Sequence, residues 1–284
     1  TMRKTTVYPS VKICTVDGSE FYTNEEGYDI IRHAMRDYRW LKVTEETQAR
    51  IDKQNLPTII QEANQLIDSE SASVVLSRKN NSLLCLLTGI EPTERVDFAD
   101  RQIRISIAWV ISDSPDNERT LRMLAAMALN TEERQHFTVE ISQAVSLGGE
   151  LGFQVDFQHL QKLTNTEQAK KILQDKLPNT TNKIAETSPQ RQQELAVELK
   201  EYRLPTQQSL IVVVTGIKKE QTLIDADIWR GLSSLVLSSD WQIVNRTLPD
   251  KNIANKLSKY FNNLMIIIGV ISAVSLLAKT LHFF

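Results

Sequence analysis

The sequence predicts an α/β fold, a mixed sheet with several helices, followed by a C-terminal transmembrane helix. Short apolar runs at 83–87 and 209–215 have the composition of buried strands. Amphipathic stretches around them begin with helix-capping residues, such as Ser114 before Pro115. The segment 264–278 contains no charged residue. These features separate a water-facing body from an apolar tail.

The composition is that of an ordinary globular chain. Of 284 residues, 41% are hydrophobic and 24% are charged, and the net charge is −2. The chain can therefore bury the core of one or two domains. It lacks the basic surplus of nucleic-acid-binding proteins, so nucleic acid is not expected as a partner. Cys14 and Cys85 are far apart and predict neither a disulfide framework nor a cysteine-based zinc site.

The first part of the chain is expected to form a short strand or hairpin and then helices. Residues 1–22 mix β-branched and turn residues, which favours the strand or hairpin. Thr23 and Glu26 form a capping-box pattern, and apolar residues then recur at helical spacing. The ranges expected to be helical are 24–41, 45–53 and 57–67.

A hairpin and a strand are predicted next. The polar segment 78–81 (Arg-Lys-Asn-Asn) separates two apolar runs, which indicates a hairpin. The stretch 102–111 becomes continuously apolar, which indicates a strand buried on both faces at its far end. Helices are expected over 114–130 and 131–148. The stretch 151–163 fits a strand and a helix face equally well.

The remainder of the body alternates helices and strands. Thr164 and Glu167 form another capping box, which predicts a helix to about residue 177, where Pro178 stops it. Further elements are expected as a helix at 189–202, a strand at 209–215, a helix at 226–237 and a strand at 241–244. The predicted organisation is an N-terminal part of the body at 1–177, an exposed linker at 178–188, a C-terminal part at 189–248 and a lead-in with tail at 249–284.

The tail is predicted to cross a membrane once. The 15 residues 264–278 give a helix of roughly 22 Å, and continuation to Phe284 gives about 31 Å, close to the hydrocarbon thickness of roughly 30 Å. Lysines precede the run and no acid follows Asp250, so the positive-inside tendency keeps the large N-terminal part in the cytoplasm. The residues assigned to the span are Leu264, Ile267, Gly269, Ile271, Ala273, Leu276 and Leu277, and those assigned to the membrane surface are Lys251, Lys256 and Lys259.

Other roles for the tail stay open. A buried core helix or an oligomerisation segment would have a similar composition. Gly269 and Ala273 are four residues apart, a spacing that lets two membrane helices approach closely. Self-association in the membrane is therefore one expectation.

Two predicted strands end in the same dipeptide. The segment LLCLLTGI at 83–90 aligns with LIVVVTGI at 210–217, and Asp100 then aligns with Asp227. Either two related halves form a pseudo-symmetric cleft, or apolar strands that lead into Thr-Gly turns look alike. Ligands of open α/β sheets bind at strand ends. The ligand-binding candidates are Thr88, Gly89, Asp100, Arg101, Thr215, Gly216 and Asp227.

The sequence contains none of the common catalytic or nucleotide-binding motifs. It has no G-x-x-x-x-G-K-[ST], no G-x-G-x-x-G and no G-x-S-x-G. His136 and Glu140 lie one helical turn apart, but a solvated helix face explains them without a metal. We therefore assign no catalytic residue and no metal ligand, and we leave the cofactor open.

These observations favour a tail-anchored membrane protein whose cytoplasmic body senses or binds something. A membrane-acting effector of a stress or defence pathway, working through helix clustering, is the extended hypothesis. Its partners would be the lipid bilayer and either further copies of the chain or another protein. The alternatives are a small-ligand enzyme with a strand-end cleft, and an assembly subunit whose apolar tail packs on a partner protein.

Overall fold

The computed structural model describes residues 7–10, 21–28, 36–43, 47–51, 53–67, 71–92, 104–147, 153–206 and 209–244 of the 284. The chain divides into two units, 1–244 and 245–284, and all described residues belong to the first. The predicted lead-in and tail, with every residue assigned to the membrane, lie outside the described ranges. Within those ranges, no helix combines the length and the apolar character that crossing a membrane requires.

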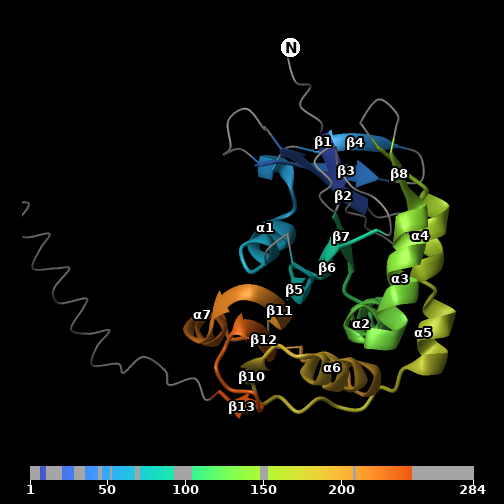
Figure 1. Ribbon diagram of the computed structural model, residues 1–284. Helices are drawn as coiled ribbons and strands as arrows, with labels where there is room; N and C mark the ends of the chain where they lie inside the picture. The colour runs from blue at the N-terminus through green and yellow to red at the C-terminus, as the bar shows by residue number, and fades with distance from the viewer. Residues whose placement is uncertain are drawn as a thin grey trace, which may run out of the picture. The chain divides into compact units, whose positions relative to one another are not determined.

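The first unit is a mixed α/β structure (Figure 1). Its strands are β1 (Val7–Ser10), β2 (Phe21–Tyr28), β3 (Arg36–Val43), β4 (Gln48–Ile51), β5 (Ser73–Lys79), β6 (Ser82–Ile90), β7 (Ile105–Ser112), β8 (Val145–Leu147), β9 (Phe153–Val155), β10 (Lys183–Glu186), β11 (Leu210–Lys219), β12 (Arg230–Leu235) and β13 (Gln242–Ile243). Its α-helices are α1 (Thr58–Asn64), α2 (Pro115–Leu129), α3 (Thr131–Ala144), α4 (Phe157–Leu163), α5 (Thr166–Ile172), α6 (Pro189–Glu201) and α7 (Glu220–Asp225).

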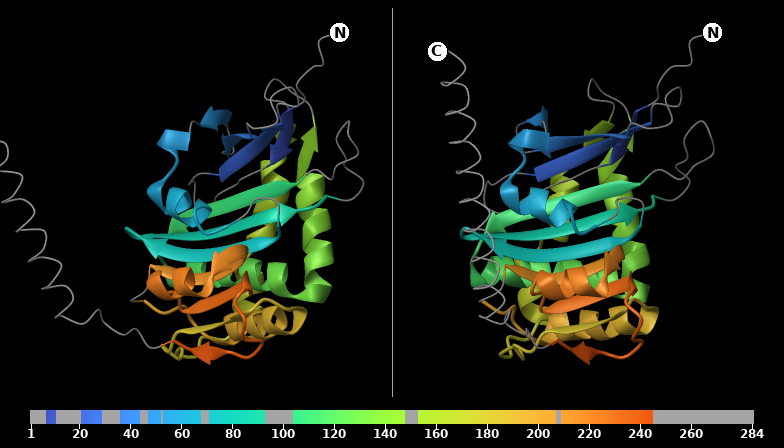
Figure 2. Two further views of the ribbon diagram at one scale, coloured as in Figure 1. Left: turned by 60° about the vertical axis from the view of Figure 1, so that its left-hand side comes forward. Right: turned by 90° about the vertical axis from the view of Figure 1, so that its left-hand side faces the viewer.

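One mixed sheet runs through the unit, as Figure 2 shows. Its strand order is β13-β10-β12-β11-β5-β6-β7-β2-β3-β4, and β1 pairs with β2. Strands β10, β12 and β11 are parallel, whereas every pair from β11 to β4 is antiparallel. Strand β5 therefore lies between β6 and β11 and runs against both. Strands β8 and β9 form a separate antiparallel pair.

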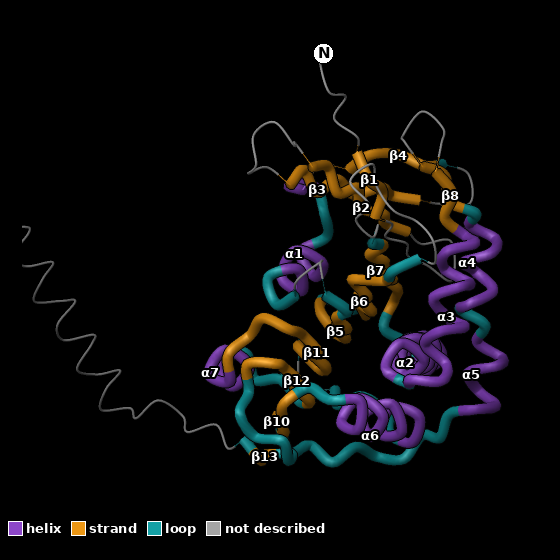
Figure 3. The backbone as a smooth tube through the Cα atoms, in the orientation of Figure 1, coloured by secondary structure: helices purple, strands orange, loops and turns teal. Residues whose placement is uncertain are grey.

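Helices cover both faces of the central strands (Figures 1 and 3). Helices α1 and α7 lie on one face, and α2, α3 and α6 lie on the other. Strands β5 and β6 are consequently buried along most of their length. This burial explains the continuous apolar runs of the two strands, because a strand covered on both faces needs no polar alternation.

The predicted hairpin is confirmed. Strands β5 and β6 pair from Ser73↔Thr88 to Lys79↔Ser82, which leaves a two-residue turn. Asn80 and Asn81 occupy the turn with φ of 50° and 61°. Two positive φ angles are the requirement of a type I′ turn, and asparagine tolerates them better than most residues do.

Three long helices begin where they were predicted, and each follows a capping side chain. The side chain of Ser114 accepts a hydrogen bond from Asn117 N at 3.3 Å and caps α2. Asn130 caps α3 by accepting from Glu132 N at 2.9 Å. Ser188 caps α6 in the same manner. Helix α1, strand β7, strand β11 and strand β13 are also confirmed.

The helices predicted over 24–41 and 45–53 are wrong. The described parts of these ranges form β2, β3, β4 and one short 3₁₀ turn, Lys53–Asn55. Strand β2 pairs with β3 on one side and with β7 on the other. Pairing with β7 joins residues some 85 positions apart, as in Phe21↔Trp109. A local capping pattern carries no information about such a partner, and tertiary pairing overrides it.

Two further predictions in the C-terminal half need correction. The range 226–237, expected to be helical, instead contains strand β12, which pairs with both β10 and β11. Residues 228–233 are all buried, so this covered strand lacks the alternation that would have identified it. The exposed linker expected over 178–188 contains β10, in which Ile184 is 1% exposed.

The ambiguous stretch 151–163 contains both elements. Its described residues form strand β9 and then helix α4, which Asp156 caps through His159 N at 2.9 Å. The helix predicted from Thr164 to residue 177 is shorter than expected. Helix α5 ends at Ile172, and Asn165 rather than Thr164 is its capping residue.

Candidate functional site

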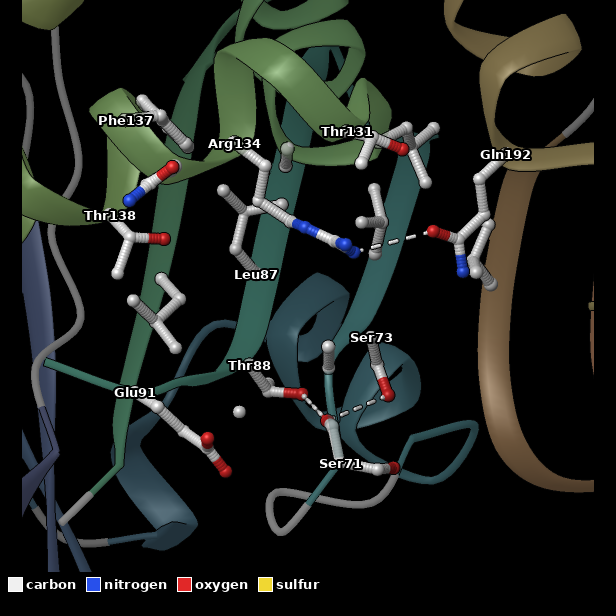
Figure 4. Close-up of a pocket in the computed structure, with 18 of the residues that line it drawn as sticks. Ser71, Ser73, Leu87, Thr88, Glu91, Thr131, Arg134, Phe137, Thr138 and Gln192 are labelled. Carbon is white, nitrogen blue, oxygen red and sulfur yellow. Dashed lines mark hydrogen bonds between the residues drawn. The ribbon is translucent and has the colours of Figure 1, made fainter. Parts of the chain in front are cut away.

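A cavity of about 520 Å³ lies where the start of β5 meets the end of β6 (Figure 4). The segment before β5, strands β5, β6 and β11, the end of α2, helix α3 and helix α6 all contribute to its wall. The labelled residues that line it are Ser71, Ser73, Leu87, Thr88, Glu91, Thr131, Arg134, Phe137, Thr138 and Gln192. Its volume falls in the range typical of small-molecule sites.

The topology explains why the two Thr-Gly segments lie near each other, although only the first is at a strand end: β6 ends at Ile90, whereas β11 continues past Gly216 to Lys219. Strands β6 and β11 both run antiparallel to β5, so their ends approach the start of β5 from its two sides. Ser71 lies there and contacts both glycine positions. A Cβ atom on Gly216 would lie 3.3 Å from Ser71 Oγ, and a Cβ atom on Gly89 would overlap the Ser71 backbone.

Gly89 is required at its position. Its φ is +66°, in the left-handed region that disfavours side chains. A Cβ atom there would lie 2.3 Å from the carbonyl carbon of Ser71. The absence of a side chain therefore lets the segment that forms one end of the cavity lie directly on the end of β6.

Only some of the predicted ligand-binding residues line the cavity. Thr88 and Gly89 do so, whereas Thr215 and Gly216 do not, although Gly216 lies next to the cavity-lining Ser71. Asp227 follows α7 and accepts a hydrogen bond from Asn182 Nδ2 at 2.8 Å. That position precedes β12, so Asp227 lies at the start of a strand that runs parallel to β11, not beside Thr215. Asp100 and Arg101 lie outside the described residues.

The floor of the cavity is apolar. Leu87 of β6, Val74 of β5 and Val214 of β11 are neighbours on adjacent strands, and each is at most 5% exposed. Leu129 at the end of α2 and Phe137 of α3 extend this surface, each 2% exposed. The floor thus offers a ligand a dry surface for an apolar or aromatic part.

One end of the cavity carries hydroxyl groups that are held in place. Thr88 Oγ1 donates a hydrogen bond to the carbonyl oxygen of Ser71 at 3.3 Å, and Ser73 Oγ donates to the same oxygen at 3.2 Å. Figure 4 shows both bonds converging on Ser71. Donation to a carbonyl does not activate a hydroxyl as a nucleophile, since activation requires a base that accepts the proton. These groups suit ligand recognition better than covalent catalysis.

The other end carries a cation. Arg134 Nη1 donates to Gln192 Oε1 at 3.4 Å, from α3 to α6. This is the one side-chain bond that Arg134 makes among the described residues, and none of them forms an ion pair with it. Glu91, which also lines the cavity, pairs with Arg104 at 3.0 Å. The cavity therefore holds a guanidinium whose charge is not compensated by the described part of the chain.

The sequence offered a partial signal for this end of the cavity. Thr131, Arg134, Gln135 and Thr138 recur at the spacing of one helix face, and all four line the cavity. A polar helix face is normally solvated, so this spacing alone does not identify a site. Gln192 comes from α6, more than 50 residues further on, and no local pattern links it to Arg134.

A second polar cluster lies in the interior and supports the fold. Arg122 of α2 is fully buried and donates to the carbonyl oxygens of Leu199 at 2.9 Å and Gln174 at 2.6 Å. Its Nη1 lies 3.0 Å from the carboxylate of Asp175. Hydrogen bonding from Arg119, with Arg122, holds the pKa of Asp175 below its ordinary value. The cluster joins α2 to the segment after α5 and to the last turn of α6.

Glu118 extends this cluster toward β5. Glu118 is 3% exposed, and its carboxylate accepts a hydrogen bond from Leu204 N at 2.9 Å and pairs with Arg78 at 3.0 Å. Arg78 also pairs with Asp113 at 2.7 Å. Every charge here has a partner, as buried ions require.

The described residues include no group of three or more histidine, cysteine, aspartate or glutamate side chains arranged to hold a metal ion. His159 Nε2 lies 2.9 Å from Glu140 Oε2 and joins α4 to α3, whereas His136 is 3.9 Å from the same carboxylate and exposed.

Comparison of the chain with protein-family models, with curated proteins and with solved structures found no match. The cavity itself is therefore the guide to function.

Proposed function

We propose that this chain is a small-ligand-binding α/β body tethered to a membrane by its C-terminal segment, with the body on the cytoplasmic side. The observation that carries the binding role is the cavity of about 520 Å³, which combines an apolar floor with polar groups at both ends. Preformed cavities of this size and character are the usual form of small-molecule sites.

The tether rests on the sequence of the tail. Residues 264–278 are uncharged, and Lys251, Lys256 and Lys259 precede them. A ligand-binding body joined to such a segment would work as a sensor, and clustering of the tails through Gly269 and Ala273 would be its output. In that form the protein acts as a membrane effector that binding of the ligand controls.

The binding role is tested by filling the cavity. Thr138 points into it from α3 (Figure 4), so Thr138→Trp should occupy the space. Val197→Trp is the matched control, because Val197 of α6 is 47% exposed and does not line the cavity. The probes are three pairs of molecules: hexanoate and hexanol, glucose 6-phosphate and glucose, and adenosine monophosphate and adenosine.

Thermal unfolding of the full chain provides the measurement. A ligand at about 100 times its Kd adds about 2.7 kcal/mol to stability, enough to raise Tm by several degrees. At least one probe should raise the Tm of the wild-type protein and of the control, but not of Thr138→Trp. The proposal fails if no probe raises Tm, or if the increase persists in Thr138→Trp.

The tether is tested separately by membrane extraction. The full chain should stay with the membrane pellet in alkaline carbonate, and replacement of Ile267 and Ile271 by lysine should release it. Each lysine at mid-span costs about 2.5 to 3.5 kcal/mol, which exceeds the modest gain from the apolar residues. Recovery of the wild-type chain in the soluble fraction would exclude the tether.

A further inference from the structure

We infer that the ligand of this cavity is an organic anion, a carboxylate or a phosphate monoester, whose charged group binds Arg134. The inference rests on the proposed binding function and specifies its chemistry. Arg134 is the cation that lines the cavity among the described residues, and it lies at the end opposite the hydroxyls of Ser73 and Thr88 (Figure 4).

The balance of charge around Arg134 favours an anionic ligand. The acids that line the cavity or adjoin Arg134 in the sequence are already engaged: Glu91, at the far end, pairs with Arg104 at 3.0 Å, and Glu133 pairs with Lys200 at 2.6 Å. Glu132 is exposed and does not line the cavity. A partly buried guanidinium without a counterion loses hydration and gains little in return. An anionic ligand would supply the missing partner.

The guanidinium of Arg134 is also oriented by its neighbours. Gln192 Oε1 accepts from Arg134 at 3.4 Å, and Gln192 Nε2 donates to Thr187 Oγ1 at 3.2 Å. The amide is thus oriented from behind by Thr187 and presents its oxygen to Arg134. Arginine carries five N–H donors, so one long bond to an amide leaves the paired donors that bind carboxylate or phosphate in bidentate fashion. Gln192 acts as a positioning residue for Arg134.

The size of the cavity favours an organic ligand. An inorganic ion would occupy a small part of 520 Å³ and would leave the floor of Leu87, Val74 and Val214 uncovered. An organic part on this floor removes apolar surface from water, which is favourable. Hydroxyl or amine groups on that part would meet Thr88, Ser73 and Glu91 at the far end.

The experiment compares the anion with the neutral member of each probe pair by isothermal titration of the full chain. Hexanoate, glucose 6-phosphate and adenosine monophosphate separate carboxylate from phosphate ligands. An anion should bind, and its neutral partner should bind at least tenfold more weakly. Arg134→Gln should raise the Kd of the anion by about tenfold to a hundredfold. Arg203→Gln is the charge-matched control, because Arg203 is 41% exposed and lies outside this cavity.

A second variant keeps the test decisive if Arg134→Gln does not fold. Gln192→Glu gives Arg134 a carboxylate from within the chain, so the fold should keep or gain stability while affinity for the anion is lost. A purely structural role for Gln192 would not produce stable folding together with lost binding.

The outcomes separate the two proposals. Equal binding of a neutral partner, or anion binding that survives both Arg134→Gln and Gln192→Glu, overturns the anion assignment while leaving a ligand-binding cavity in place. Binding of no member of any pair to the wild-type chain overturns the binding function itself.

Discussion

Substitution of Gly89 by alanine tests how the end of the cavity is built. The new Cβ atom would lie 2.3 Å from Ser71 C, 2.4 Å from Ser71 O and 2.5 Å from Ala72 N. Carbon atoms in contact prefer about 3.5 to 4.0 Å, so the backbone at Ser71 has to move by about 1 Å or more. Nothing flexible can absorb this overlap, because the atoms concerned belong to the main chain.

The cost follows from two contributions. An alanine in the left-handed region costs about 1 to 2 kcal/mol. Movement of Ser71 breaks the hydrogen bonds from Thr88 and Ser73, and each contributes about 0.5 to 1.5 kcal/mol. We therefore expect Gly89→Ala to lower the free energy of unfolding by about 2 to 5 kcal/mol.

Gly216 supplies an internal control, since it belongs to the matching Thr-Gly segment of β11, which continues to Lys219. A Cβ atom there would lie 3.3 Å from Ser71 Oγ, which belongs to a side chain that can rotate, and no backbone atom lies nearer. Gly216→Ala should change stability by less than about 1 kcal/mol in either direction.

Urea unfolding, followed by the fluorescence of the buried Trp109 and Trp229, measures both variants. Equal effects of the two substitutions, or a loss below about 1 kcal/mol for Gly89→Ala, would refute this account of the strand end.

Three further predictions concern the interior. Arg122→Met should lower the free energy of unfolding by about 3 to 5 kcal/mol, because it leaves buried carbonyls and carboxylates without their donor, and urea unfolding measures the loss. The pKa of Asp175 is lower in the folded than in the unfolded protein, where it is about 3.9, so the ionised carboxylate stabilises the fold above that pH. This stabilisation disappears as the pH falls through the lower folded-state pKa. Asp175→Asn should therefore show a smaller loss of Tm on acidification than the wild-type protein; equal slopes would contradict the assignment. Burial raises the pKa of the Cys85 thiol, so in a Cys14→Ser background iodoacetamide should label the protein only after unfolding, as mass spectrometry would show, and rapid labelling of the folded protein would contradict the buried placement.

The sequence predicted best the elements whose signals are local. The Asn80-Asn81 turn, the helix starts at Ser114, Thr131 and Ser188 and the apolar run of β11 all have signals within a few residues of the structure that they specify. The failures over 24–41 and 226–237 share a cause. In each case the segment becomes strand because of a distant pairing partner, β7 for one and β10 for the other.

The residues of the candidate site also differ in whether a local signal in the sequence predicts them. Thr88 and Gly89, which were predicted because strand ends in α/β sheets are a general location for ligands, line the cavity. The two Thr-Gly segments both lie near Ser71, but only the first lines the cavity. The strands that follow them also differ, since β7 runs antiparallel to β6 and β12 runs parallel to β11. Arg134 and Gln192 were missed because their proximity depends on how α3 packs near α6.

The pairing of β5 with β11 also determines when the cavity can form. It joins Val74 to Val214, about 140 residues later in the chain, and both residues belong to the cavity floor. Contacts of such long range form slowly, because the entropy of closing a large loop is lost before the contact is gained. During synthesis the hairpin of β5 and β6 can form early, but one edge of it stays open until β11 has left the ribosome. Ligand binding by this cavity would therefore report that the last central strand has been added to the sheet.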